Sequence, residues 1–283
     1  MVKVIDGKLL AAEVLEDVKL RVDKLKSKNI IPCLCLIRIG NDPASEIYVK
    51  GKINDCQKVG IRSEYIHLQN NITQEELLFI LKEKNQDKLV HGILVQLPIP
   101  KHLDSQKIIA NISPTKDADG FHTINVGMLA QGNISQATIA CTPAGIIKML
   151  ESTNIELSGK NAVIIGRSNI VGKPMALLLI SKNCTVTICH SQTKNLPSIV
   201  ANADILIIAI GKSEFIKAEW IKKGAVVIDV GMNKNSQGKL TGDLEFNGAK
   251  ERAAYISPVP GGVGPMTRAM LLSNTVHLAE KNT

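Results

Sequence analysis

Apolar residues recur every three or four positions near the start of the chain and afterwards gather into short blocks separated by glycine, proline and charged residues. The block IPCLCLIRIG (31–40) is apolar at nearly every position, which is typical of a strand buried on both faces. After it, Asp42 suits the N-cap and Pro43 the first turn of a helix. A helix is also predicted over residues 9–25, where five apolar residues share one stripe: Leu10, Val14, Val18, Val22 and Leu25.

The alternation of strand and helix continues to the end of the chain. In the first half it predicts a strand at 64–69, a helix at 73–85 and a strand at 92–98. The stretch 100–142 lacks a regular period, and we interpret it as loop and linker. The rest predicts helices at 143–149, from Pro174 and from Pro265, and strands at 161–166, 184–190, 203–211 and 225–231. This order is typical of two α/β domains with parallel sheets, and we expect a ligand-binding cleft between them.

The composition excludes several classes of protein. Of 283 residues, 45% are hydrophobic and 21% charged, as in globular proteins. The net charge of +8 suits either a lysine-rich surface or an anionic ligand, whereas 3% aromatic residues and scattered lysines disfavour nucleic acid. Six cysteines without C-x-x-C disfavour a metal site and indicate a reducing compartment. Early acidic residues and short apolar runs predict no signal peptide, no membrane span and a cytoplasmic location.

A glycine turn follows the predicted strand at 161–166. It is GRSNIVGKP (166–174), in which Ser168 replaces the second glycine of G-x-G-x-x-G and Gly172 comes one residue late. Such a turn either binds a dinucleotide or only makes a tight connection. An NAD site usually has an acidic residue about 20 positions further on, but CHSQTKN (189–195) contains none. With Arg167 as partner of a 2′-phosphate, the pattern favours NADP over NAD.

Polar residues in the first half are candidates for chemistry. Tyr48 and Lys52 lie four apart on a predicted helix and so share one face, as many surface pairs do. The pattern Y-x-x-x-K also marks short-chain dehydrogenases, but there it follows the glycine turn, and here it precedes that turn. Gln96 ends an apolar strand, where it is either a capping amide or a site residue. Asp117 and Asp119 suit an ordinary turn.

Taken together, these segments resemble the bifunctional methylenetetrahydrofolate dehydrogenase/methenyltetrahydrofolate cyclohydrolase family. The matching motifs occur in the family's order and span nearly the whole chain: YVKGK (48–52), QLPIP (96–100), PTKDADGF (114–121), CTPAG (141–145), GRSNIVGKP (166–174), DVGMN (229–233) and PVPGGVGPMT (258–267). The chain departs from the usual pattern at Ile99, at Ala118 and in GDLEF (242–246), none of which we assign to chemistry.

The resemblance implies a folate-binding catalytic domain at residues 1–140, completed by 262–283, and a Rossmann-type NADP-binding domain at 141–261. It implies oxidation of 5,10-methylenetetrahydrofolate to the methenyl cation with NADP, followed by hydrolysis to 10-formyltetrahydrofolate. This chemistry belongs to one-carbon metabolism and purine biosynthesis. The implied partners are tetrahydrofolate derivatives, NADP and a second copy of the chain, bound through the second domain as a homodimer.

The resemblance also implies residue roles. Lys52 is the expected catalytic base, with Gln96 orienting it and Tyr48 contacting the folate ring system. Asp119 is the expected pterin anchor. A loop with Pro260, Gly261 and Gly262 is expected to close over the folate. No metal is expected, and the expected cofactor-binding residues are Gly166, Arg167, Ser168, Val171, Gly172, His190, Ser191, Thr193 and Gly231.

Three other interpretations keep part of this pattern. A shikimate-type dehydrogenase has a similar two-domain plan, but Gln96 and Asp119 do not obviously supply groups for a carboxylate and hydroxyls. A hydrolase that keeps the dinucleotide domain only as a scaffold is a second alternative. A nucleotide-sensing binding module is a third, and it leaves Lys52 unexplained. The sequence leaves open whether the prolines of QLPIP and PVPGG are cis or trans.

Overall fold

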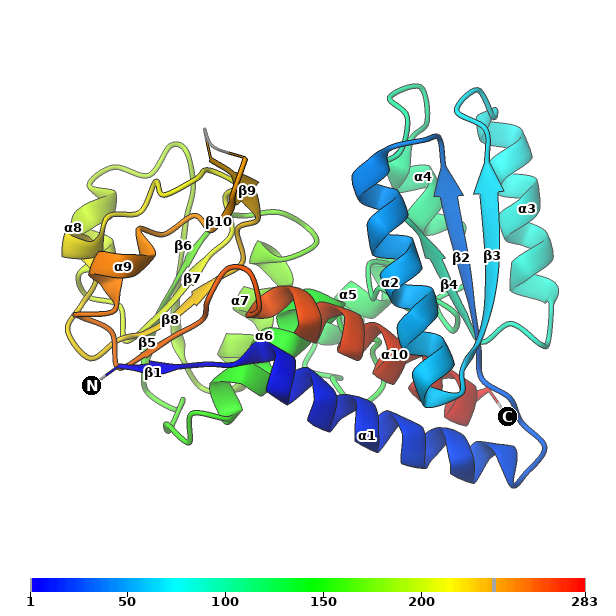
Figure 1. Ribbon diagram of the computed structural model, residues 1–283, viewed down its shortest axis with the longest axis horizontal. Coiled ribbons are helices and arrows are strands. Elements are labelled where there is room, and N and C mark those ends of the chain that lie inside the picture. Colours follow the sequence, from blue (N-terminus) through cyan, green and yellow to red (C-terminus); the bar gives the residue numbers. More distant parts are fainter. Residues whose placement is uncertain (1, 236–237, 283) are drawn as a thin grey trace. The chain divides into compact units, whose positions relative to one another are not determined.

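The computed structural model describes residues 2–235 and 238–282, which fall into two compact units (Figure 1). The three-stranded unit holds residues 12–141 and the chain from Arg268 onward, and the six-stranded unit holds Thr142–Thr267 and the residues up to Ala11. The sequence led us to expect residues 1–140 and 262–283 in this first unit. In the structure, the residues up to Ala11 and residues 262–267 belong to the six-stranded unit instead. The reason at the N-terminus is that β1 (Lys3–Val4) pairs with β11 (Tyr255–Ile256) in the larger sheet.

The three-stranded unit is a parallel sheet with helices on both faces. Its elements are β2 (Cys33–Ile39), α2 (Pro43–Val59), β3 (Arg62–Leu68), α3 (Gln74–Gln86), β4 (Gly92–Val95), α4 (Ser105–Ala110), α5 (Thr123–Ala130) and most of α1 (Gly7–Lys26) and α10 (Val263–Lys281). The strand order is β3-β2-β4, and β2 is buried throughout, as predicted. Leu34 and Leu36 of β2 pack in one core with α1, α2 and α10, whereas Cys35 and Ile37 pack in another with α3 and α4.

The six-stranded unit is a parallel sheet of order β1-β11-β8-β7-β5-β6. Its further elements are most of α6 (Cys141–Glu151), β5 (Asn161–Ile165), α7 (Gly172–Ser181), β6 (Thr185–Cys189), α8 (Leu196–Val200), β7 (Ile205–Ile208), the 3₁₀ turn η1 (Ala218–Trp220), β8 (Val226–Asp229), the antiparallel pair β9 (Asn233–Lys234) and β10 (Leu240–Thr241), and α9 (Phe246–Ala249). The four strands predicted in this half are confirmed. The apolar runs of β5, β7 and β8 are buried because helices and loops cover both faces of such a sheet, whereas β6, at the edge, is largely exposed.

Local signals account for the ends of several helices. The carboxylate of Asp42 accepts a 2.7 Å hydrogen bond from the Ser45 amide, and Pro43 occupies the first turn of α2, as predicted. Thr73 and Glu76 form a reciprocal capping box at the start of α3. In α1 the predicted stripe faces inward, with Val18 and Val22 fully buried.

The interpretation of 100–142 as loop and linker is wrong in part, because the stretch contains α4 and α5. Both helices are short, so their apolar residues complete too few turns to give a visible period. Asp104 caps α4 by accepting from the amides of Gln106 and Lys107, and the His122 ring caps α5 by accepting from the Ile124 amide. These helices are stabilised by their caps and by packing in the tertiary core, and not by a long amphipathic pattern of their own.

Two further features complete the description. The Leu97–Pro98 and Val259–Pro260 peptide bonds are cis, which answers the question left open for QLPIP and PVPGG. Among the described residues, no helix has both the length and the apolar character needed to cross a membrane.

Candidate active site

Lys52 and Gln96 meet at the carboxyl edge of the three-stranded sheet. Gln96 directly follows β4, and its amide nitrogen continues the strand ladder by donating to the Ile37 carbonyl at 2.8 Å. The Gln96 side-chain amide donates to the Leu97 carbonyl at 2.6 Å, which leaves Oε1 oriented to accept. Nζ of Lys52, on α2, donates to that oxygen at 2.9 Å. The amine is therefore held by a group that carries no charge.

Asp119 is the negative charge with the largest influence on the Lys52 amine. Burial raises the pKa of the Asp119 carboxyl to about 6, although the neighbouring Lys52 acts in the opposite direction. Burial likewise lowers the pKa of Lys52, and Asp119 opposes that shift only in part. Each group is thus easier to neutralise than its free counterpart, so a proton can be taken up or released here near neutral pH.

A polar network fixes the loop that carries Asp119. The buried carboxylate of Asp117 accepts from the amides of Gly120 and His122 at 3.0 and 2.8 Å, and from Nδ2 of Asn125 at 2.8 Å. Nδ2 of Asn274, on α10, donates to the Ala118 carbonyl at 3.0 Å. The sequence did not identify Asn274 as a support, because its partner is 156 residues away along the chain, and it gave no motif for Asn125, whose partner is eight residues away.

Tyr48 lies one helical turn before Lys52 on α2, as its spacing predicts, and its side chain is 38% exposed. Cys141, at the start of α6, is buried beside Lys52 and Asp119. Burial raises the pKa of its thiol well above the usual value, so this cysteine stays protonated. The protonated sulfur is therefore not available to accept a proton in this cluster.

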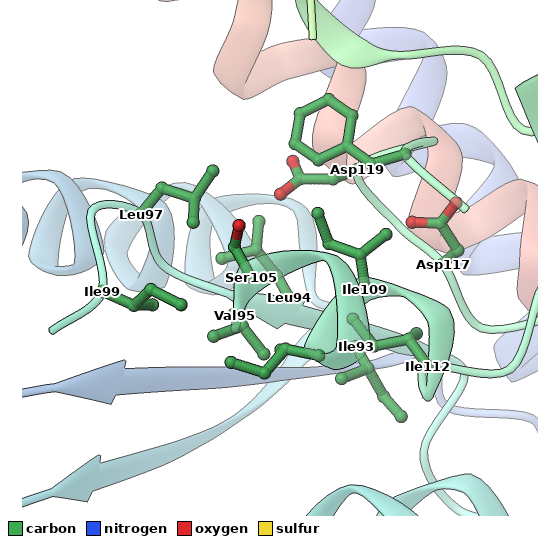
Figure 2. A pocket seen from close by; sticks show the side chains of 12 residues that line it. Ile93, Leu94, Val95, Leu97, Ile99, Ser105, Ile109, Ile112, Asp117 and Asp119 are labelled. Atoms are coloured by element: carbon green, nitrogen blue, oxygen red, sulfur yellow. The ribbon is translucent and has the colours of Figure 1, made fainter. Parts of the chain in front are cut away.

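An apolar cavity of about 20 Å³ lies behind Asp119, between β4, α4 and the 117–121 loop. Figure 2 shows the Asp119 carboxylate at the edge of side chains that include Leu97, Ile93 and Ile109. The volume admits about one water molecule and no organic ring. The cavity therefore explains the desolvation of Asp119 rather than offering a binding pocket.

In the six-stranded unit, the turn after β5 requires both of its glycines. Gly166 has φ of +126°, and a Cβ atom there would lie 2.3 Å from the Ala209 carbonyl oxygen. A Cβ on Gly172 would lie 2.2 Å from the Gly166 carbonyl oxygen. Oγ of Ser168 accepts from the amides of Val171 and Gly172 at 3.1 and 3.4 Å. The serine in place of the second glycine thus closes the turn onto α7.

Arg167 and the segment after β6 lie at the carboxyl ends of neighbouring strands. The Gly166 amide donates to the Cys189 carbonyl at 2.9 Å, which places the two turns side by side. Arg167 and Ser191 are exposed. The His190 amide donates to Oγ1 of Thr193 at 2.8 Å, which folds the second turn back on itself. The arrangement presents a guanidinium and hydroxyls at one edge, a suitable set for a phosphate.

Two buried carboxylates that sequence reasoning missed organise the loops after β7 and β8. Asp243 accepts from the amides of Ile210, Gly211 and Lys212 and from Nδ2 of Asn233, at 2.7 to 2.9 Å. Asp229 accepts from three further amides, and its burial raises its pKa to about 6. A Cβ on Gly231 would lie 2.3 Å from the Asp243 carboxylate. Asp243 belongs to GDLEF, which was noted only as a departure from the family pattern.

The segment Pro258–Gly262 lies in the six-stranded unit, whereas the division expected from the sequence placed Gly262 in the other domain. A Cβ on Gly262 would lie 2.5 Å from the Pro258 carbonyl oxygen, so the turn is tight. Pro258, Pro260 and Gly261 line a hollow together with Asp6 and Lys8. The described residues contain no group of three or more His, Cys, Asp or Glu side chains that could hold a metal ion.

Comparison with known families covers both units. Residues 5–119 match the catalytic domain of tetrahydrofolate dehydrogenase/cyclohydrolase, and residues 140–283 match the NAD(P)-binding domain of the same family. Both matched ranges contain motifs on which the resemblance rests. The first contains YVKGK (48–52) and QLPIP (96–100), and the second contains CTPAG (141–145) and GRSNIVGKP (166–174).

Similar proteins match over the whole chain. The bifunctional protein FolD of Ruminiclostridium cellulolyticum is 55% identical over 273 residues, covering 96% of this chain and 95% of the relative. The structure of the FolD methylenetetrahydrofolate dehydrogenase/cyclohydrolase from Campylobacter jejuni has a TM-score of 0.98 and 46% identity, with full coverage of both chains. A Trypanosoma brucei FolD structure, complexed with NADP cofactor and inhibitor, has a TM-score of 0.94 and 37% identity, covering 99% and 98%.

Proposed function

Because the chain belongs to the tetrahydrofolate dehydrogenase/cyclohydrolase family, we propose that it oxidises 5,10-methylenetetrahydrofolate with NADP and hydrolyses the resulting 5,10-methenyltetrahydrofolate to 10-formyltetrahydrofolate. The observation that carries this proposal is the cluster of Lys52, Gln96 and Asp119 at the edge of one sheet. It places an amine of lowered pKa beside a buried carboxylate, and these are the two groups that the chemistry needs.

In the hydrolysis, the electrophilic methenyl carbon needs an attacking water and a base. Lys52 serves as that base, because burial lowers the pKa of its amine toward the range in which it accepts a proton at neutral pH. Gln96 orients the amine through the 2.9 Å hydrogen bond without stabilising its charged form as a carboxylate would. The cationic substrate also repels a charged ammonium, which favours the neutral amine further.

Substrate binding falls to Asp119 and Tyr48. The ionised carboxylate of Asp119 accepts from the amino-pyrimidine edge of the pterin, and its loop is held still by Asp117. A buried polar contact of this kind discriminates strongly against molecules that lack the donors. Tyr48 supports the ring system from the same face of α2 that carries Lys52. Pro260, Gly261 and Gly262 belong to the loop proposed to cover the folate.

NADP is the cofactor, and it supplies the hydride acceptor for the first step. The residues of the glycine turn suit this cofactor. Gly172 packs against Gly166 without a side chain, so the amides at the start of α7 remain open to a phosphate group. Arg167 holds the 2′-phosphate, with His190, Ser191 and Thr193 at the adjoining turn. Asp243 keeps Gly231 and the loop after β7 in place. Ser168 and Val171 shape the turn itself.

We also propose a homodimer formed through the six-stranded unit, a cytoplasmic location and a place in one-carbon metabolism that serves purine biosynthesis. Exposed apolar residues on the edge strand and on the helix before it support the dimer: β6 is at the end of the sheet order, Ile188 on β6 is 39% exposed and Ile180 on α7 is 56% exposed. Six buried free cysteines support a reducing compartment.

A spectrophotometric assay tests the function. The purified protein is given 5,10-methylenetetrahydrofolate with NADP or NAD, formation of the reduced cofactor is followed, and decay of added methenyltetrahydrofolate is recorded separately. Both activities are expected, with NADP preferred. Hydrolysis without cofactor reduction would favour a hydrolase with a degraded dinucleotide domain, and binding of NADP without either reaction would favour a nucleotide-sensing module.

A further inference from the structure

An ion pair lies one helical turn beyond Lys52 and is used by neither proposed reaction step. Oδ2 of Asp55, on α2, lies 3.0 Å from Nε of Arg268, which enters from α10. The Asp55 side chain is only 6% exposed, whereas that of Arg268 is 39% exposed. Lys58 is 3.5 Å from the other Asp55 oxygen and is itself exposed. A buried carboxylate thus anchors a guanidinium whose outer part remains accessible.

The glycine before Lys52 makes room for this guanidinium. A Cβ atom on Gly51 would lie 2.5 Å from Nη1 of Arg268, so the charged group rests directly against the α2 backbone. Glycine inside a helix costs about 1 kcal/mol relative to alanine, which makes its presence in α2 notable. Gly51, Asp55 and Arg268 therefore form one arrangement. The glycine lowers the helix propensity of α2, and its missing side chain lets the Arg268 guanidinium lie against the backbone next to Lys52.

We propose that Arg268 is a positioning residue for Lys52: anchored on Asp55 and seated over Gly51, its guanidinium supplies a fixed positive field that favours the neutral, proton-accepting form of the neighbouring amine. The inference rests on the proposed role of Lys52 as base. Arg268 does not touch the reacting atoms in this scheme and acts only through the lysine.

The other charges around Lys52 determine what the guanidinium can contribute. Asp119, on the loop before α5, favours the ammonium, and the thiols of Cys141 and Cys56 do so only if ionised, which burial opposes. Tyr48 shares the α2 face, and Gln96 carries no charge. Arg268 is the cation that acts in the same direction as burial and lowers the pKa of Lys52. Without Arg268, the effect of Asp119, which raises the pKa of Lys52, is less strongly opposed.

The two partners of the ion pair should then act in opposite directions. Arg268→Gln removes the positive charge and keeps a polar side chain, so the pKa of Lys52 should rise by about half a unit or more. Asp55→Asn removes the negative charge but keeps a side chain of the same shape against the guanidinium, so Arg268 stays in place and the pKa of Lys52 should fall. Arg268→Lys, the conservative variant, should restore the wild-type value to within about 0.2 units. A merely structural ion pair would give similar losses from either side.

The experiment measures the titration of the Lys52 amine directly and the hydrolytic activity of the protein in parallel. Competitive labelling with acetic anhydride, followed by mass spectrometry of the peptide that contains Lys52, gives the midpoint of amine titration in each full-length variant. The pH profile of methenyltetrahydrofolate hydrolysis is recorded in parallel. For Arg268→Gln the labelling midpoint and the rising limb of kcat should move together to higher pH, with hydrolysis at neutral pH falling about threefold or more and recovering at alkaline pH.

An unmoved midpoint in Arg268→Gln overturns the inference, as does an upward shift in both Arg268→Gln and Asp55→Asn. If Arg268→Gln does not fold, Asp55→Asn decides alone, because a midpoint that rises or stays in place contradicts a field dominated by Arg268 and a downward shift supports it. A midpoint that moves as expected while the kcat profile stays in place supports the effect of Arg268 and instead refutes Lys52 as the base.

Discussion

Nζ of Lys52 donates a 2.9 Å hydrogen bond to Oε1 of Gln96, and this contact joins the middle of α2 to the residue that directly follows β4. The acceptor is an amide, which fixes the amine in space without adding a negative charge that would hold its proton. Burial can then lower the pKa of the lysine, and Asp119 limits the extent of that shift. The contact thus orients the proposed base, whereas burial and Asp119 control its charge.

Lys52→Met should abolish methenyltetrahydrofolate hydrolysis, with a loss of at least about 100-fold, because it removes the amine proposed to take up the proton from water. NADP binding should be unchanged, since the residues proposed to bind the cofactor lie in the six-stranded unit. Stopped hydrolysis with normal NADP titration by fluorescence is the expected pair of results. Hydrolysis at the wild-type rate in this variant would remove Lys52 from the mechanism.

Gln96→Glu should move the rising limb of the hydrolysis profile to higher pH. The new carboxylate would face the Lys52 amine at hydrogen-bond distance and stabilise its charged form, so the pKa of the lysine should rise by about one unit or more. Gln96→Met, which removes the acceptor without adding charge, is the matched control and should lower kcat without that displacement. Identical profiles for the two variants would contradict the electrostatic explanation.

Folate affinity should depend on pH through Asp119. The pKa of this carboxyl is raised to about 6, and only the ionised form accepts from the pterin. The affinity should therefore rise as pH increases through about 6 and level off above it. Asp119→Asn, measured by calorimetry over the same range, should bind folate at least about tenfold more weakly and lose this dependence. An unchanged affinity in the variant would exclude Asp119 as the anchor.

Arg167→Ala should weaken NADP binding by about 10- to 100-fold, which is the usual loss for a charge-assisted contact to phosphate. Binding of NAD should change by less than about threefold, because NAD lacks the 2′-phosphate. Dissociation constants for the two cofactors provide the comparison, and Lys173→Ala serves as a control cation in the same turn. Equal losses for NADP and NAD would refute the assignment of Arg167.

Gly172→Ala should destabilise the protein by about 1–3 kcal/mol or more, because the new Cβ meets backbone that cannot move aside cheaply. The distance to the Gly166 carbonyl oxygen would be 2.2 Å. Gly127→Ala, in α5, is the matched control: no atom lies within 4 Å of its added Cβ, so helix propensity should raise stability slightly. Urea denaturation followed by circular dichroism measures both, and equal stability of the two variants would contradict the packing explanation.

The strands and long helices could be predicted from the sequence because the patterns that specify them are local. The apolar block at 31–40 and the cap Asp42 act within a few residues, so periodicity and turn chemistry predicted them. The short helices α4 and α5 were missed, since six and eight residues hold too little periodic pattern. Motifs in the family's order identified Lys52, Gln96 and Asp119, but spacing alone could not show that they meet.

Other contacts had no local signal. Asp243 binds amides of the loop after β7, and Asn274 binds the Ala118 carbonyl from a distant helix, so neither role was visible in the surrounding residues. The same holds for Asp55 and Arg268, each of which is an ordinary charged helix residue in the sequence. Their importance depends on burial and distance, which the rest of the chain supplies.

The amino-acid sequence by itself determined the alternating α/β architecture, the glycine turn with its arginine and the membership of a folate-enzyme family, because backbone periodicity, turn geometry and motif order are properties of neighbouring residues. Only the tertiary structure decided which charges are desolvated and which groups face them. The pKa values of Lys52 and Asp119 change because segments far apart in the chain remove water from around them, and the field at an ionisable group depends on all the charges gathered near it.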